Sequence, residues 1–322
     1  MMDIIAPVPE KLLAEQDIIK GGMTLVDEKR ALAIHRALKK SAKTTQVSVQ
    51  EVAGGSAANT MAGIAALGLR AAYISKVADD ALGQRFRAGL HEAGLFYETP
   101  PTTSGPATAR CMIAVTPDGE RSMSTFLGAT TQIRRADVVR KHIEAASILY
   151  LEGYLFDKPT AKAALEKAAS IAVAAGRKVA LTLSDDFCVH QHRDDFNRLV
   201  DNHVDILFAN ETELLSLTQK DDFEAALESL KNRCETACIT RSEKGSVILN
   251  GNTRYDIPAS PVDNVVDTTG AGDQYAAGVL TGHALGLAWP DCGWLGSLSA
   301  AEVISHYGAR PITSIHKIAI GA

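Results

Sequence analysis

The 322-residue sequence lacks several features, and each absence argues against a class of protein. Its five cysteines are scattered and odd in number, and Cys234 and Cys238 have no second cysteine or histidine pair nearby to complete a zinc site. We therefore expect buried free thiols in a reducing compartment. Lys and Arg number 33 against 38 Asp and Glu, and the net charge of −5 gives no indication of nucleic-acid binding.

The sequence also shows no pattern typical of a targeting or membrane-spanning segment. The N-terminus has no basic region followed by an apolar core, and no apolar run approaches the length that spans a bilayer. We expect a cytoplasmic protein without a membrane partner. The sequence also lacks the Gly-Lys-Ser/Thr ending of a P-loop, the Gly-x-Gly-x-x-Gly dinucleotide fingerprint, and a legible Ser-His-Asp or Cys-His arrangement.

Helical and strand-like segments alternate over most of the chain. Extended runs such as Ala71–Lys76, Lys178–Leu183 and Ile206–Ala209 alternate with helical patterns such as Thr160–Ala175 and Gln274–Leu287. This alternation predicts an α/β fold with a mostly parallel central sheet covered by helices on both faces. The chain is long enough to bury a large core.

One region departs from this alternation. Thr108–Thr116 and Arg121–Leu127 are β-prone runs on either side of the turn sequence Pro-Asp-Gly-Glu, which predicts a hairpin. Gln46–Val52 alternates apolar and polar residues, as a strand with one face in water does. We expect a small sheet that projects from the α/β body, either as an edge decoration or as a lid over a cleft.

The most informative stretch is Val266–Asp273, with the sequence Val-Asp-Thr-Thr-Gly-Ala-Gly-Asp. Its glycines lie where an extended segment turns into a helix, so the unpaired amides of the first helical turn can bind a phosphate or a developing oxyanion. A carboxylate repels phosphate but can take a proton from an attacking hydroxyl, which suits Asp273 as a general base. For an isolated Gly-x-Gly-Asp, a capping aspartate after a glycine turn is the alternative.

A second motif opens a helix after the strand Gln46–Val52. Gly54 and Gly55 permit a ligand to approach the backbone, and the amide of Asn59 can donate to and accept from a sugar diol. An ordinary glycine turn is the alternative.

A third motif follows the apolar run that ends at Ala209. Asn210 and Glu213 are three residues apart and share a helix face at the carboxyl end of a predicted parallel strand. An amide and a carboxylate there can hold water molecules of a hydrated Mg²⁺. The same spacing is close to that of a capping box, and the two roles can coexist.

Together these motifs resemble those of the ribokinase (PfkB) family of carbohydrate and nucleoside kinases, over nearly the whole chain. The form Gly-Gly-Ser-x-x-Asn, and the strings that contain Tyr154 and Phe187, look most like adenosine kinases of that family. The resemblance implies a ribokinase-like three-layer α/β/α body with a small β-sheet lid.

The resemblance also implies catalytic roles. Asp273 is the base, while Gly270, Ala271 and Gly272, with the amide of Asp273, form the anion hole. Arg121 follows the lid turn and is expected to reach the transferring phosphate, although an exposed turn arginine is usually only solvated.

Ligand-binding roles follow in the same way. In the substrate site, Asp3, Gly54, Gly55 and Asn59 hold the ribose hydroxyls, and Tyr154 and Phe187 offer flat faces to a purine unless they are core aromatics. The remaining positions are assigned to ATP and Mg²⁺, with K⁺ as a further possibility, and they are Asn210, Glu213, Thr240, Ser242, Gly245 and Thr268. Ser242 replaces the first glycine of the family's Thr-x-Gly-x-x-Gly loop, and a plain polar turn is the alternative there.

The expected division into two parts is discontinuous. The body is assigned 27–43, 54–98 and 129–322, and the lid 4–26, 44–53 and 99–128. Family members begin with a strand that ends in a Gly-Asn-x-x-x-Asp segment, of which Met1–Ala6 matches only the tail. We therefore expect the first core strand to be missing or truncated at residues 1–3.

The sequence thus predicts an ATP-dependent kinase that phosphorylates a nucleoside 5′-hydroxyl, with adenosine as the substrate, by in-line transfer. A sugar kinase of the same family, acting on ribose or fructose, is one alternative. A non-catalytic nucleoside-binding protein is the other. We expect small-molecule ligands only, and a monomer or homodimer.

Overall fold

The alternating segments of the C-terminal half build a six-stranded sheet. The computed structural model describes residues 1–46, 48–156 and 158–313. Strands β6 to β9 are parallel, β10 pairs antiparallel with β9, and β11 pairs antiparallel with β10, in the order β11-β10-β9-β8-β7-β6. The strands are β6 (Ile148–Glu152), β7 (Lys178–Thr182), β8 (Ile206–Asn210), β9 (Thr236–Thr240), β10 (Ser246–Asn250) and β11 (Thr253–Ile257).

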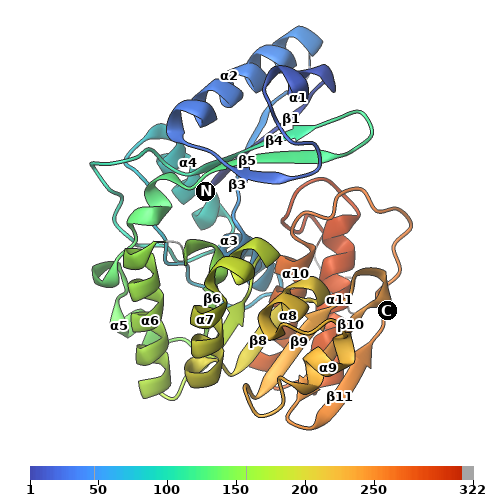
Figure 1. Cartoon of the computed structure of the whole chain (residues 1–322). Coiled ribbons are helices and arrows are strands. Elements are labelled where there is room, and N and C mark those ends of the chain that lie inside the picture. The colour runs from blue at the N-terminus through green and yellow to red at the C-terminus, as the bar shows by residue number, and fades with distance from the viewer. Residues whose placement is uncertain (47, 157, 314–322) are drawn as a thin grey trace.

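Helices cover both faces of this sheet, which confirms the predicted α/β/α layers (Figure 1). One layer is α5 (Arg140–Glu144), α6 (Pro159–Ala174), α7 (Asp186–His203), α8 (Glu211–Thr218) and α9 (Phe223–Glu228). The other layer is α3 (Ser56–Ala66), α10 (Ala271–Ala284) and α11 (Trp289–Ile304). The last two helices cross closely because a Cβ on Gly278 would lie 2.6 Å from the Cα of Gly296.

The smaller sheet has five strands in the order β2-β5-β4-β1-β3. They are β1 (Met2–Pro7), β2 (Met23–Leu25), β3 (Gln50–Ala53), β4 (Arg110–Val115) and β5 (Arg121–Phe126). The predicted hairpin is present, with Arg110 opposite Phe126 and Val115 opposite Arg121. Four short 3₁₀ turns connect elements elsewhere: Gly128–Gln132, Arg135–Asp137, Gly153–Leu155 and Ser242–Lys244.

Three helices, α1 (Lys11–Glu15), α2 (Glu28–Thr45) and α4 (Ala81–Glu92), pack with the smaller sheet around one apolar cluster. Ile34 and Leu38 of α2 are buried in it. The sequence-based division placed residues 27–43 in the body, but the apolar face of α2 lies on the smaller sheet, above which it runs in Figure 1.

The structure also bears on two other predictions, the truncated first core strand at residues 1–3 and the strand at Ala71–Lys76. Met2–Pro7 forms β1, which pairs with β3 and β4 in the smaller sheet, so β6 is the outermost strand of the larger one. The strand predicted at Ala71–Lys76 is not formed in the described ranges, where this segment makes one isolated bridge, from Ala72 to Phe96. No helix in the described ranges is long and apolar enough to cross a bilayer.

Candidate active site

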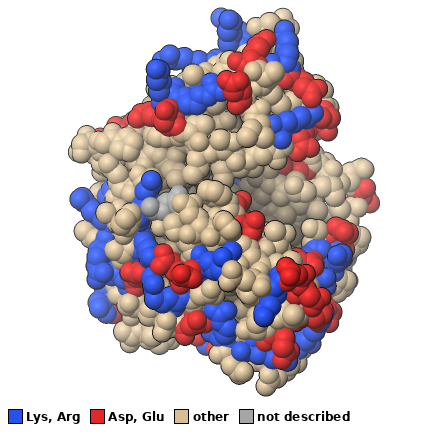
Figure 2. All heavy atoms as spheres, in the orientation of Figure 1, with Lys and Arg blue, Asp and Glu red and all other residues tan. Residues whose placement is uncertain are grey.

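A cleft of about 730 Å³ lies between the two sheets, and Figure 2 shows the surface hollowed there. Most of the predicted site residues line it: Asp3, Gly55, Asn59, Arg121, Tyr154, Asn210, Glu213, Thr240, Thr268, Gly270, Ala271, Gly272 and Asp273. Four do not, namely Gly54, Phe187, Ser242 and Gly245. Concave sites that gather polar groups from several elements are the usual places where small ligands bind.

The glycine motif lies at the start of α10. Gly270 has a φ of 81°, which glycine adopts without strain, and a Cβ there would lie 2.8 Å from the Cα of Ala309. A Cβ on Gly272 would meet no atom within 4 Å, so this position faces open space. The Ala271 amide, predicted as part of the anion hole, donates instead to the carbonyl of Thr268 over 3.2 Å. The next two amides form no hydrogen bond within the described chain and can bind an anion.

The Asp273 carboxylate follows these amides in the same turn. Its Oδ2 accepts a hydrogen bond from Nδ2 of Asn59 over 3.2 Å, although 214 residues separate the two. Burial raises the pKa of Asp273 to about 6, while hydrogen bonds from Ser56 and Asn59 oppose the rise. Such a carboxylate is ionised at neutral pH and is a stronger base than a solvated aspartate.

Asp3 on β1 faces the same cleft from the smaller sheet. Burial raises its pKa to about 6, against the attraction of nearby positive charges that include Arg310. A Cβ on Gly54 would lie 2.0 Å from Oδ2 of Asp3. Gly54 therefore does not line the cleft, but its missing side chain makes room for the Asp3 carboxylate.

Arg310 completes this cluster, and the motifs gave no indication of it. Its Nε donates to Oδ1 of Asn59 over 3.3 Å, while Nη2 is buried without a hydrogen-bond partner in the described chain. Gln274 holds the two segments together, because its Nε2 donates to the carbonyls of Asn59 and Ala309 over 3.0 and 2.9 Å. A single arginine before a proline near the C-terminus carries no pattern that one sequence reveals.

Arg121 on β5 reaches across the cleft to the loop before α10. Its Nη2 lies 2.6 Å from Oδ2 of Asp267, and its Nη1 is 3.4 Å from the Thr269 hydroxyl. The Asp267 carboxylate also accepts hydrogen bonds from the amides of Thr269 and Gly308, over 3.0 and 2.8 Å. Arg121 is thus buried and paired at the cleft, and not solvated on an exposed turn. Asp267 was quoted within the motif but given no role.

Asn210 and Glu213 form the capping box that was one of their two interpretations. Oδ1 of Asn210 accepts from the Glu213 amide over 2.8 Å, and Oε2 of Glu213 accepts from the Asn210 amide over 3.1 Å. Burial raises the pKa of Glu213 to about 7, and the charge of Asp185 adds to the rise. Both residues line the cleft, so the cap does not exclude a ligand-binding role.

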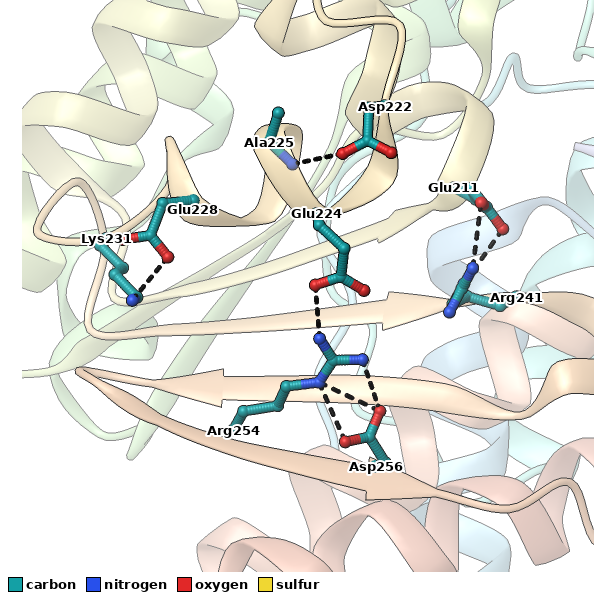
Figure 3. A network of polar contacts seen from close by, with 9 residues as sticks. All are labelled: Glu211, Asp222, Glu224, Ala225, Glu228, Lys231, Arg241, Arg254 and Asp256. Carbon is teal, nitrogen blue, oxygen red and sulfur yellow. Dashed lines mark hydrogen bonds and ion pairs between the residues drawn. The ribbon is translucent and has the colours of Figure 1, made fainter.

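The loop after β9 is fixed by Arg241, as Figure 3 shows. Its guanidinium donates to both carboxylate oxygens of Glu211 over 3.1 and 3.2 Å and lies 3.8 Å from the ring centroid of Phe223. Ser242 has a φ of 52°, a left-handed conformation that explains why a glycine would fit there. A Cβ on Gly245 would lie 2.1 Å from the carbonyl oxygen of Ile257. Ser242 and Gly245 therefore shape the loop without lining the cleft.

The two aromatic candidates have different environments. Tyr154 lines the cleft, and its hydroxyl donates to the carbonyl of Ser184 over 2.9 Å, which fixes the ring. Phe187 is 58% exposed at the start of α7 and does not line the cleft. Of the two rings, Tyr154 is thus the one that faces the cleft.

Comparison with known proteins identifies the family. The profile of the pfkB family of carbohydrate kinases matches residues 20–315. The crystal structure of adenosine kinase from Sinorhizobium meliloti is 45% identical, with a TM-score of 0.91 over 100% of this chain and 96% of that one. The structure of a "probable sugar kinase" from Rhizobium etli is 44% identical, with a TM-score of 0.90 over 99% and 95%. Adenosine kinase from Saccharomyces cerevisiae is 27% identical over 97% of this chain and 96% of its own.

Fold and site therefore define a phosphotransferase with a ribokinase-like architecture, which confirms the class predicted from the motifs. The chain belongs to the pfkB family of carbohydrate kinases.

Proposed function

We propose that the chain transfers the γ-phosphoryl group of ATP to the 5′-hydroxyl of adenosine. The observation that carries the proposal is the Asp273 carboxylate, whose pKa burial raises to about 6, beside the free amides at the start of α10 in a cleft that Asp3 faces from the other side. Adenosine is favoured among acceptors by the similarity over the full length to the adenosine kinase of Sinorhizobium meliloti.

Asp273 takes the proton of the 5′-hydroxyl as the oxygen attacks the γ-phosphorus. A bond forms between that oxygen and phosphorus, the bond from phosphorus to the bridging oxygen of ATP breaks, and ADP leaves with the electron pair. The amides of Gly272 and Asp273 stabilise the charge on the transferring group, and so does Arg121. Asp3 and Asn59 bind the ribose hydroxyls, and Arg310 orients Asn59 through their hydrogen bond.

The nucleotide side of the cleft fits a magnesium complex of ATP. In the described chain no cluster of three His, Cys, Asp or Glu residues could hold a metal by itself. Mg²⁺ commonly keeps its water and is held by substrate phosphates with one or two protein groups, for which Asn210 and Glu213 supply an amide and a carboxylate. When bound, the metal ion neutralises phosphate charge. Thr240 and Thr268 line the same region and are proposed to contact the nucleotide.

A substrate panel tests the proposal. The purified chain is incubated with ATP and Mg²⁺ and with adenosine, other nucleosides, ribose or fructose, and both ADP and the phosphorylated product are measured. We expect the highest kcat/KM with adenosine. A higher kcat/KM with a free sugar would make the chain a sugar kinase, the candidate favoured by its similarity to the Rhizobium etli protein.

A binding protein without activity would give a different result. Adenosine would then raise the melting temperature, more so at higher ligand concentration, but no AMP would form with any nucleotide. The ionised base and the free amides of the cleft argue against that outcome.

A further inference from the structure

A second pocket lies on the outer side of the smaller sheet, away from the cleft. It measures about 370 Å³ and lies between α2 and α4, over the start of β4. We call it the α2–α4 pocket; its polar lining is His35, Arg36, Lys39, Asp80, Arg85 and Arg110.

The pocket and the cleft lie on opposite faces of β4. Met112 and Ala114 point into the apolar cluster beneath α2 and α4, whereas Cys111 and Ile113 line the cleft. Because side chains alternate along a strand, Arg110 shares the outer face with Met112. The two sites are therefore separated by one layer of backbone.

Arg110 at the floor of the pocket is a buried cation that forms no ion pair among the described residues, although the charges of Asp80, Glu28 and Glu51 attract it. It is 6% exposed, and its Nε is buried with no hydrogen-bond partner in the described chain. Burial lowers its pKa, but a guanidinium stays charged in proteins. Burying a charge that forms no ion pair is unfavourable, and an anionic ligand would offset that cost.

The Asp80 carboxylate, which lines the pocket, is engaged by other donors. Oδ1 of Asp80 accepts from the Gly83 amide over 2.8 Å and from the Thr108 hydroxyl over 2.7 Å. Its Oδ2 accepts from the Thr108 amide over 2.9 Å. Asp80 thus caps α4 and holds the strand end, and forms no ion pair with Arg110 in the described chain.

Glu51 is likewise engaged by other cations. Its Oε1 lies 2.8 Å from Nζ of Lys39, and its Oε2 contacts Arg85. Glu28 attracts Arg110 through its charge but forms no ion pair with it among the described residues. The lining holds four cations and one carboxylate, Asp80; even with Glu28 and Glu51 counted, one positive charge remains, and Arg110 forms no ion pair among the described residues.

We propose that the α2–α4 pocket binds a phosphate group, either free or carried by a small metabolite, through Arg110 and the cations around it. Guanidinium groups bind phosphate oxygens with paired hydrogen bonds, and the remaining positive charge favours an anionic ligand. The volume leaves room for a short carbon chain beside the phosphate.

The test measures binding of inorganic phosphate and of glycerol 3-phosphate to the whole chain by calorimetry. Arg110→Met removes the buried charge and keeps a side chain of similar shape, and we expect the dissociation constant to rise about ten-fold or more, the loss of a charge-assisted hydrogen bond. Lys39→Ala should weaken binding less. Lys40→Ala is the matched control: it removes the same charge from the next residue of α2, which does not line the pocket, and should change nothing.

The anion site at α10 can also bind phosphate, and the variants separate the two places. Equal affinity in wild type, Arg110→Met and Lys39→Ala would assign all binding to α10 and overturn the proposal, as would no detectable binding to wild type. If Arg110→Met fails to fold, Lys39→Ala against Lys40→Ala still decides. Tighter binding of glycerol 3-phosphate than of phosphate identifies a phosphorylated metabolite as the ligand; the reverse identifies the free ion.

Discussion

The Arg121 guanidinium lies 2.6 Å from the Asp267 carboxylate, and this ion pair joins the smaller sheet to the loop before α10. Arg121 belongs to β5, and Asp267 is anchored by the amides of Thr269 and Gly308. The pair therefore closes the cleft on one side. A phosphate bound at α10 would compete with Asp267 for the guanidinium, so the pair can hold Arg121 in place until a nucleotide arrives.

Arg121→Met should lower kcat by about two to three orders of magnitude, the usual loss when one donor to a developing charge is removed. Asp267→Asn is the comparison, since it breaks the same pair but keeps the guanidinium. We expect Asp267→Asn to lower the melting temperature, because a buried cation loses its partner, with a smaller fall in kcat. Steady-state kinetics and thermal unfolding measure both. Equal falls in kcat would mean that Arg121 acts only by positioning the loop.

Asp273→Asn keeps the shape of the side chain and removes the base. We expect phosphoryl transfer to fall by about two to four orders of magnitude at saturating ATP, while adenosine still binds. Asp263→Asn is the matched control, because Asp263 is an exposed aspartate of the loop before α10 and does not line the cleft. Turnover near that of wild type in Asp273→Asn would show that another group accepts the proton.

The pH profile should follow Asp273, whose pKa is raised to about 6 by burial. A base acts only when deprotonated, so kcat/KM should fall as the pH drops below about 6 and stay level above it. Asp3 has a pKa raised to about 6 as well, which is why the variants are needed. Asp3→Asn should keep the acid limb of the profile, and Asp273→Asn should lose it. An acid limb that survives in Asp273→Asn would contradict the assignment.

The sequence predicts best what depends on local pattern. The hairpin at β4 and β5, the helix that starts in the glycine motif and the strand before Asn210 all follow from periodicity and turn residues. The segment Ala71–Lys76 has the same composition as a strand but is not one, because a strand needs a neighbour and the sequence does not specify which segments meet. The same limit applies to α2, whose apolar face is evident but whose partner sheet is not.

The candidate site divides in the same way. Asp273 and Asn59 belong to motifs that the sequence shows, and the hydrogen bond between them joins segments 214 residues apart. Arg310 reaches the same cluster from the C-terminal segment and belongs to no motif, so only the structure identifies it as part of the site. Phe187 stays a prediction: an aromatic ring suits a purine site, but at the start of α7 this ring is 58% exposed and does not line the cleft.

Glu213→Gln separates the capping role from the metal role. Gln can still accept from the Asn210 amide, so the cap should persist, but it is a weaker group for Mg²⁺, and the Mg²⁺ concentration for half-maximal activity should rise. The pKa of Glu213 is raised to about 7, so its neutral form favours the folded state, and that stabilisation is lost as the pH rises from 4.5 through 7. The melting temperature of the variant relative to wild type should therefore be higher at pH 8 than at pH 5. An unchanged Mg²⁺ requirement would leave only the cap.

Arg241→Ala should weaken ATP binding through the loop after β9. The guanidinium is held by two hydrogen bonds to Glu211 and lies over Phe223, and losing both releases the loop that follows Thr240. We expect KM for ATP to rise by about ten-fold, or ~1.4 kcal/mol, with little change in kcat.

The matched control for that variant is Arg254→Ala. Arg254 is paired with Glu224 and Asp256, as Figure 3 shows, but it lies on β11 outside the cleft, so its loss should change stability and not KM. Initial rates at varied ATP, with thermal unfolding of both variants, distinguish the two effects. If both substitutions raise KM equally, the cause is general loosening of this end of the sheet. If only Arg241→Ala does, the ion pair with Glu211 positions the nucleotide loop.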